Sequence, residues 1–251
     1  MPSDAQENVR PSHLVSADFR DKAIVDGIYE PELVPKPLIP VSDAVGVVVA
    51  VGPGVTNLKE GDRVNSHLYS AWVDGNPKPN ELAFCYGTPL PGGLAEYMIL
   101  NAATAVKAPA AMTDEEASTL PIAALTAWYS MMDYGHLQPG QTVLAQGTGG
   151  VSVFAIQIAS ALGARVIATS SRDENLEKVK ALGAWQTINY RRHPEWEKKA
   201  LELTDGSLPD EDAHEVDLCL LALQKPNLKD LAADAGGLDG LIDPVASDDV
   251  Q

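Results

Sequence analysis

The chain has 251 residues, of which 45% are hydrophobic and 21% charged, a composition that supports one or two domains with sizeable cores. Its net charge of −17, with no local basic patch to offset it, disfavours nucleic acid as a partner. Two cysteines, the lack of a long apolar run and the lack of a secretory signal predict a soluble, cytoplasmic protein without disulfides or membrane partners.

The first half of the chain has the pattern of short β segments separated by proline and glycine. Residues 31–40 hold four prolines, which predict an extended approach to a β-branched strand at 45–51. Further strands are expected at 63–65 and 94–100, with a long loop over 75–93 between them. These segments predict a β-barrel domain over residues 1–112.

A helical pattern begins at Thr113, where Thr113 and Glu116 have the spacing of a capping box. Pro121 suits the first turn of a second helix, which we expect to run to about Tyr134. Four large side chains of that helix are expected to pack in the core: Trp128, Tyr129, Met131 and Met132.

From residue 141 the chain alternates between strand and helix. Strands are expected at 142–146, 165–169 and 187–189, and helices at 151–162 and 175–182. This alternation predicts a parallel sheet covered by helices, in a second domain over residues 113–251. The expected fold class is therefore α/β.

A glycine-rich segment, Gly147-Thr148-Gly149-Gly150-Val151-Ser152, lies between the first of these strands and an apolar helix. Gly147 allows the sharp turn, and Gly149 allows a pyrophosphate to approach the backbone at the positive end of the helix. The alternative is a glycine-rich turn that binds no ligand.

Residues from about 12 to 206 resemble the medium-chain dehydrogenase/reductases, especially their zinc-independent, quinone-oxidoreductase-like branch. The segments that carry the likeness are SADFRD (16–21), IPVSDAVGVVVAVGPGV (39–55), LKEGDRV (58–64), GGLAEY (92–97), LTAW (125–128) and QGTGGVSVFAIQIASALGARVIATSS (146–171). The resemblance implies a GroES-like β-barrel domain that holds the substrate and a Rossmann domain that binds a nicotinamide dinucleotide. It also implies hydride transfer between this cofactor and a small-molecule substrate.

The end of the second Rossmann strand favours NADP as the cofactor. Ser170-Ser171-Arg172 offers no carboxylate before Asp173, and Arg172 can pair with a 2′-phosphate. The resemblance implies a second phosphate contact from Tyr190, whereas its lysine position here holds Asn175. NAD as the cofactor and Arg172 as a solvated surface cation remain the alternatives. The resemblance implies that Thr126 lies near the nicotinamide. The expected cofactor-binding residues are Thr126, Gly147, Thr148, Gly149, Gly150, Val151, Ser170, Ser171, Arg172 and Tyr190.

The resemblance also predicts that no metal is bound. The zinc-ligand positions of zinc-dependent relatives correspond here to Ala17 or Asp18, Ser42-Asp43 and Ile122, and the loop over 66–92 has only Cys85. Without a Lewis acid, quinones or conjugated carbonyls are the expected acceptors. The proton donor is left open among Asp18, Tyr129 and Tyr134.

Both ends of the chain depart from the family pattern. Only about ten polar residues precede the matching segment, where relatives have a pair of strands, so the β domain is expected to be incomplete at its N-terminus. After about residue 206 the likeness nearly disappears, in a tail whose residues 205–251 include 12 acidic and 2 basic side chains. In this tail we expect strands at 214–223 and 238–245 with a helix at 226–235 between them, and so an incomplete Rossmann sheet.

Two explanations of these ends remain open. The chain is either a shortened product or a working variant that pairs with another chain, for instance as a homo-oligomer, through its open sheet edge. The corresponding functions are a zinc-independent NADPH-dependent oxidoreductase and a truncated, non-catalytic dinucleotide-binding protein or interaction partner.

Overall fold

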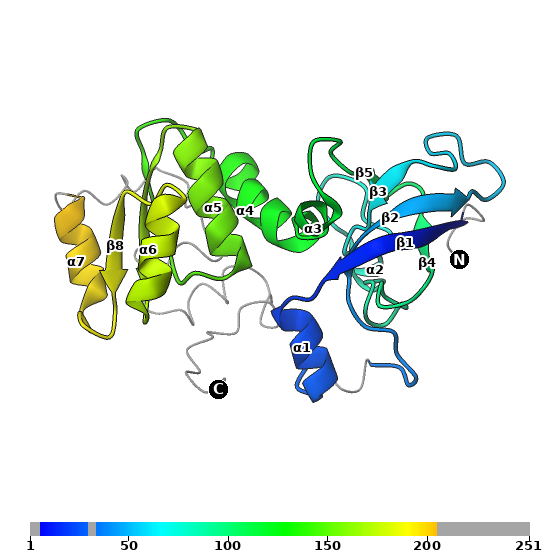
Figure 1. Cartoon of the computed structure of the whole chain (residues 1–251), viewed down its shortest axis with the longest axis horizontal. Helices are drawn as coiled ribbons and strands as arrows, with labels where there is room; N and C mark the ends of the chain where they lie inside the picture. The colour runs from blue at the N-terminus through cyan, green and yellow to red at the C-terminus, as the bar shows by residue number, and fades with distance from the viewer. Residues whose placement is uncertain (1–5, 30–33, 205–251) are drawn as a thin grey trace. The chain divides into compact units, whose positions relative to one another are not determined.

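The computed structural model describes residues 6–29 and 34–204. The chain divides into two compact units, Met1–Leu125 and Thr126–Gln251, each with its own sheet (Figure 1). The predicted domain boundary after residue 112 lies earlier in the chain, next to Thr113, which caps helix α3 (Asp114–Ala117). Within the described ranges, no helix is long and apolar enough to span a membrane.

The first unit is built on an antiparallel sheet with the strand order β4-β1-β2-β3-β5. Its strands are β1 (Gln6–Ser16), β2 (Asp43–Ala50), β3 (Arg63–Asn65), β4 (Met98–Asn101) and β5 (Val106–Lys107). The polar residues before Ser12, expected to contribute no strand, form the first half of β1, which pairs with β4 on one side and β2 on the other. Main-chain hydrogen bonds to β2 and β4 hold this segment in the sheet. Because these bonds involve only the backbone, the polar sequence of the segment does not reveal them.

The core of this unit lies against the sheet. It consists of Ala44, Val48, Leu58, Val64, Tyr86, Met98 and Leu100. The strand predicted at 94–100 is wrong in its first half, since β4 begins at Met98. The amides of Gly92 and Gly93 donate instead to the carbonyls of Ile39 and Val41, both at 2.7 Å, so the chain that enters this segment is held away from the sheet ladder. Helices α1 (Phe19–Asp26) and α2 (Pro79–Leu82) were not predicted.

The helical stretch after Thr113 confirms the capping box. Thr113 Oγ1 accepts from the Glu116 amide at 3.3 Å, and Glu116 Oε2 accepts from the Thr113 amide at 2.9 Å. The predicted second helix is divided into π-helical η2 (Leu120–Ala124), α4 (Leu125–Trp128) and π-helical η3 (Tyr129–Tyr134).

The core prediction for this second helix is only half correct. Met131 is fully buried and Met132 packs against the core, but Trp128 and Tyr129 are 47% and 45% exposed. The wider π turns change the period at which side chains return to one face, so a 3.6-residue pattern misplaces them.

The second unit confirms the predicted strand–helix alternation. Its elements are β6 (Thr142–Ala145), α5 (Gly150–Ala161), β7 (Arg165–Ser170), α6 (Asp173–Ala181), β8 (Gln186–Asn189) and α7 (Trp196–Leu203). The three strands are parallel in the order β6-β7-β8. Helix α6 starts at Asp173 rather than Asn175, and α7 was not predicted. The elements expected beyond residue 204 lie outside the described residues.

Both faces of this parallel sheet are covered. Alternate strand residues such as Val143 and Val166 belong to one core cluster with residues of α5 and α6, while Leu144, Ile167 and Ile188 belong to another with Ala200 of α7. Burial on both faces explains why β6 and β7 have continuous apolar stretches, whereas β8 has a single apolar residue, Ile188. Because the strands are parallel, their carboxyl ends share one edge, and the glycine turn, Arg172 and Tyr190 all follow from that edge.

Candidate functional site

The glycine turn joins β6 to α5 and is fixed by two side chains. Gly147 has φ +79°, a left-handed conformation that favours glycine, and its amide donates to Thr169 Oγ1 at 3.0 Å. Ser152 Oγ donates to the Gln146 carbonyl at 2.9 Å, which ties the first turn of α5 back to the end of β6. The turn is therefore held in place by the neighbouring strand β7 and by the helix that it starts.

The space beside the turn is open. Gly149 is the extended N-cap of α5 and provides no side-chain cap, so no cap from the described residues occupies the first amides of this 12-residue helix. Among the described residues, a Cβ atom added to Gly149 would meet no atom within 4 Å beyond the adjoining backbone. A pyrophosphate suits this position, because it needs close backbone approach, free amides and the positive end of a helix dipole. The residues present therefore fit a dinucleotide.

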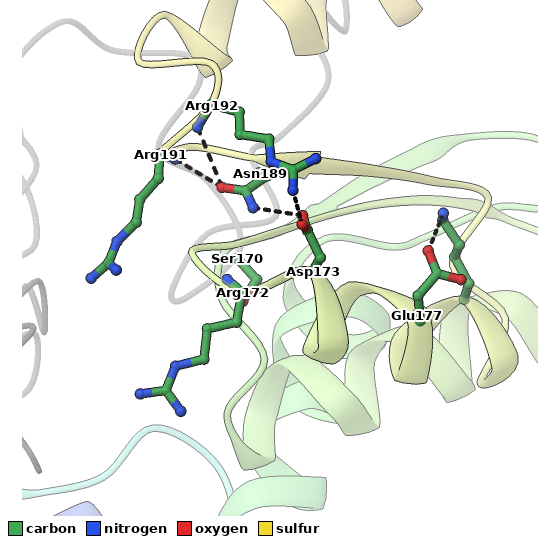
Figure 2. A network of polar contacts seen from close by, with 8 residues as sticks. Ser170, Arg172, Asp173, Glu177, Asn189, Arg191 and Arg192 are labelled. Atoms are coloured by element: carbon green, nitrogen blue, oxygen red, sulfur yellow. Dashed lines mark hydrogen bonds and ion pairs between the residues drawn. The ribbon is translucent and has the colours of Figure 1, made fainter.

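The end of β7 is cationic. Ser170 is buried, Ser171 half-buried and Arg172 exposed. The Arg172 amide donates to Ser170 Oγ at 3.3 Å, but its guanidinium has no hydrogen bond or ion pair within the described residues. Figure 2 shows this side chain extending away from the neighbouring polar network. Lys178 chiefly, and Arg172 to a lesser extent, lower the pKa of the exposed Glu174 carboxyl. With no ion pair to the described residues, the guanidinium is available for an anionic ligand.

Asp173, the first carboxylate after β7, is already occupied. Its Oδ1 accepts from Asn189 Nδ2 at 2.7 Å, and its Oδ2 forms an ion pair with Arg192 (Figure 2). The amide of Tyr190 donates to the Ser170 carbonyl at 3.2 Å, so this half-buried tyrosine lies next to the end of β7.

A direct contact links the second helix to the glycine turn. Asn175 Nδ2, on α6, donates to Thr148 Oγ1 at 3.3 Å. The structure thus joins the glycine turn, the end of β7 and the start of α6 around one edge of the sheet. Thr126 lies half-buried in α4, with no hydrogen bond to these residues within the described chain. Its role beside a nicotinamide stays a prediction.

A second polar cluster, missed in the sequence, lies in the first unit. Asp43 is buried at the start of β2, where its Oδ1 accepts from Ser42 Oγ and its Oδ2 from the Ile122 amide, both at 3.0 Å. The pKa of the Asp43 carboxyl is raised to about 7, mainly by burial and in part by the charges of Asp18 and Asp21, although its two hydrogen bonds act to lower it. An acid that directly precedes a β-branched run was the only signal of this buried group.

Asp18, one of the three candidate proton donors, has a structural role. It caps α1: its Oδ1 accepts from the Asp21 amide at 3.1 Å, and Asp21 Oδ2 accepts from the Asp18 amide at 3.0 Å. Tyr129 and Tyr134 are 45% and 54% exposed. No feature of the described residues selects one of the three as the donor.

Two of the zinc-ligand positions of the resemblance, Asp43 and Ile122, come together here, and the isoleucine has no ligand atom in its side chain. Asp43 and Ile122 are in direct contact, but the Asp43 oxygens accept hydrogen bonds from a hydroxyl and an amide. Among the described residues, no group of three or more His, Cys, Asp or Glu is arranged to hold a metal ion. Zinc independence itself stays a prediction.

Two family models match the chain, one in each half. The alcohol dehydrogenase GroES-like domain matches residues 9–110, and the zinc-binding dehydrogenase model matches residues 150–249. The second match extends through most of the acidic tail, where we had expected the likeness to disappear. Together the two models account for the order of a β domain followed by a Rossmann domain.

Individual relatives agree with the family models. A zinc-type alcohol dehydrogenase-like protein of Schizosaccharomyces pombe is 41% identical over 193 residues, which cover 76% of this chain and 56% of that protein. A solved structure from Sinorhizobium meliloti 1021, assigned as an alcohol dehydrogenase, superposes with a TM-score of 0.74 at 41% identity, covering 81% of this chain and 60% of that one. Quinone oxidoreductase from Escherichia coli, solved in complex with NADPH, gives a TM-score of 0.64 at 28% identity, covering 81% of this chain and 55% of that one. The chain thus spans little more than half the length of these relatives.

Proposed function

Because the chain belongs to the medium-chain dehydrogenase/reductase superfamily, we propose that it is a zinc-independent oxidoreductase that uses NADPH to reduce a quinone or a conjugated carbonyl. A bound reduced nicotinamide supplies the hydride in such a reaction. The proposal includes a small-molecule substrate, a cytoplasmic location and pairing of two copies through an edge of the second sheet, whose described strands are β6, β7 and β8.

One observation carries the proposal: in the described part of the chain, the glycine turn at the start of α5 is open, and the guanidinium of Arg172, at the end of the next strand, has no ion pair. In the proposed complex the amides of residues 149–151 hold the pyrophosphate, while Arg172 and Tyr190 hold the 2′-phosphate. Thr126 lies beside the nicotinamide, as the family resemblance implies.

The choice of NADPH over NADH is supported by Asp173, the nearest carboxylate, because its oxygens already have partners in the protein. NAD-binding Rossmann sites use an acid at the end of the second strand to hold the ribose hydroxyls. Asp173 is the first acid after β7, and both of its oxygens already have partners. The E. coli relative solved with NADPH supports the same choice.

The absence of zinc from the proposed reaction rests on the residues at the ligand positions. Ile122 has no ligand atom in its side chain, and Asp43, which accepts hydrogen bonds from Ser42 and Ile122, has no set of metal-binding partners among the described residues. Hydride acceptors that need little polarisation then suit the site best. We expect metal analysis of the purified protein to find less than stoichiometric zinc, whereas stoichiometric zinc that EDTA removes together with activity would contradict this part of the proposal.

The decisive experiment is NADPH oxidation with a panel of quinones and conjugated enones. Turnover with at least one acceptor, dependent on Arg172, is the expected result. Binding of NADPH without turnover on any acceptor would favour a non-catalytic dinucleotide-binding protein instead. Light scattering of the same sample measures whether two copies pair.

A further inference from the structure

Asn189 organises the polar network after β8. Its Oδ1 accepts from the amides of Arg191 at 3.0 Å and Arg192 at 3.4 Å, which closes the turn that follows the strand. Its Nδ2 donates to Asp173 Oδ1 at 2.7 Å, and Asn189 itself is only 8% exposed. Arg192 completes the arrangement by pairing with Asp173 Oδ2. Both oxygens of Asp173 are therefore held by residues at the end of β8; we call these contacts the Asp173 clamp.

The clamp acts on one side of β7. In the sheet order β6-β7-β8, the glycine turn follows β6 on one side of β7, whereas both partners of Asp173 come from the opposite side. Figure 2 shows Arg172 and Arg191 extending together, away from the Asp173 carboxylate. Two consecutive residues of opposite charge, Arg172 and Asp173, are thus directed apart.

A free carboxylate at the end of the second Rossmann strand would attract ribose hydroxyls and repel a 2′-phosphate. We infer that the Asp173 clamp determines nucleotide specificity: Asn189 and Arg192 are positioning residues that withhold Asp173 from the nucleotide and leave the phosphate position to Arg172. This inference rests on the proposed use of NADPH. In the proposed complex Asn189 and Arg192 do not touch the cofactor and act only through Asp173.

The test is the ratio of NADPH to NADH affinity in an Arg192→Ala variant, measured by calorimetric titration. Arg192 is 69% exposed at its side chain, so the variant should fold like the parent. Freeing Asp173 should lower the preference for NADPH by about 3- to 10-fold, the size of one partly screened charge interaction. Lys180→Ala is the matched control, since it also removes a cation and breaks an ion pair of α6, with Glu177, and should leave the ratio unchanged.

Repeating the Arg192→Ala measurement in an Asp173→Asn protein distinguishes the effect of the clamp from a general loss of positive charge. In an Asp173→Asn protein there is no carboxylate to withhold, so Arg192→Ala should no longer change the ratio. An equal change of the ratio in both backgrounds, or no change in either, would overturn the clamp alone. A parent protein that prefers NADH would overturn the proposed cofactor as well, so the two failures are distinguishable.

Discussion

The side-chain amide of Asn175 donates a hydrogen bond to Thr148 Oγ1 at 3.3 Å, which connects helix α6 to the glycine turn. Asn175 occupies the position where the family resemblance implies a phosphate-binding lysine. The asparagine thus braces the site but adds no charge to it.

Asn175→Lys should tighten NADPH binding by about tenfold without improving NADH binding, because a new charge-assisted contact contributes about 1.5–3 kcal/mol and the lost neutral bond about 1 kcal/mol. Titration of both nucleotides measures the effect. Asn175→Met is the control: it removes the bond to Thr148 without adding a cation, and it should weaken both nucleotides alike. Equal tightening of NADPH and NADH by the lysine would contradict the prediction.

Gly149→Val should abolish dinucleotide binding while the protein still folds. The added side chain would meet no protein atom within 4 Å of its Cβ, so it occupies only the space proposed for the pyrophosphate. Valine is a poor N-cap, which costs about 1 kcal/mol of stability in chemical denaturation. Ala161→Val, at the other end of the same helix, should bind like the parent. A folded Gly149→Val protein with parental affinity would place the cofactor elsewhere.

Arg172→Ala should weaken NADPH much more than NADH, because only NADPH carries the 2′-phosphate. A charge-assisted hydrogen bond of about 1.5–3 kcal/mol corresponds to roughly 10- to 150-fold in affinity. Tyr190→Phe should act in the same direction but less, since it removes a neutral donor. Equal weakening of both nucleotides by Arg172→Ala, in the same titrations, would make Arg172 an ordinary surface residue.

The parts of the fold that could be predicted are those in which one local signal suffices. The continuous apolar runs at β6 and β7 predict strands buried on both faces, and Thr113 with Glu116 predicts a cap. Strand β1 was missed altogether, because its backbone pairing with β2 and β4 leaves no mark on a largely polar sequence. Helix α1 was missed because its capping box uses Asp18 and Asp21 instead of the more usual Ser or Thr with Glu.

The candidate site was predictable only in part. Gly147 and Arg172 lie next to strand ends that the sequence indicates, so their shared edge follows from a parallel sheet. The partners of Asp173 come from the end of β8, and those of Asp43 include a residue far along the chain, Ile122. Such contacts depend on tertiary packing, which neither periodicity nor a local motif contains.

The buried carboxyl of Asp43 predicts how stability depends on pH. Burial raises its pKa from the ordinary value of 3.8 to about 7, so between about pH 4 and 7 the folded protein holds a proton that the unfolded chain has lost. The free energy of unfolding should therefore fall as the pH rises through this window, by up to about 1.4 kcal/mol per pH unit, and level off above it.

Asp43→Asn should flatten the pH dependence of the free energy of unfolding, because an asparagine side chain does not titrate. Its oxygen can still accept a hydrogen bond from Ile122 or Ser42. Burial also raises the pKa of Asp21, so part of the slope should remain. Urea unfolding of parent and variant at several pH values between about 5 and 8 measures the difference. Asp74→Asn, at an exposed aspartate of the same unit, controls for the loss of one charge and should keep the parental slope. If Asp43→Asn also keeps the parental slope, Asp43 is ionised throughout this range, and its two hydrogen bonds offset the effect of burial on its pKa.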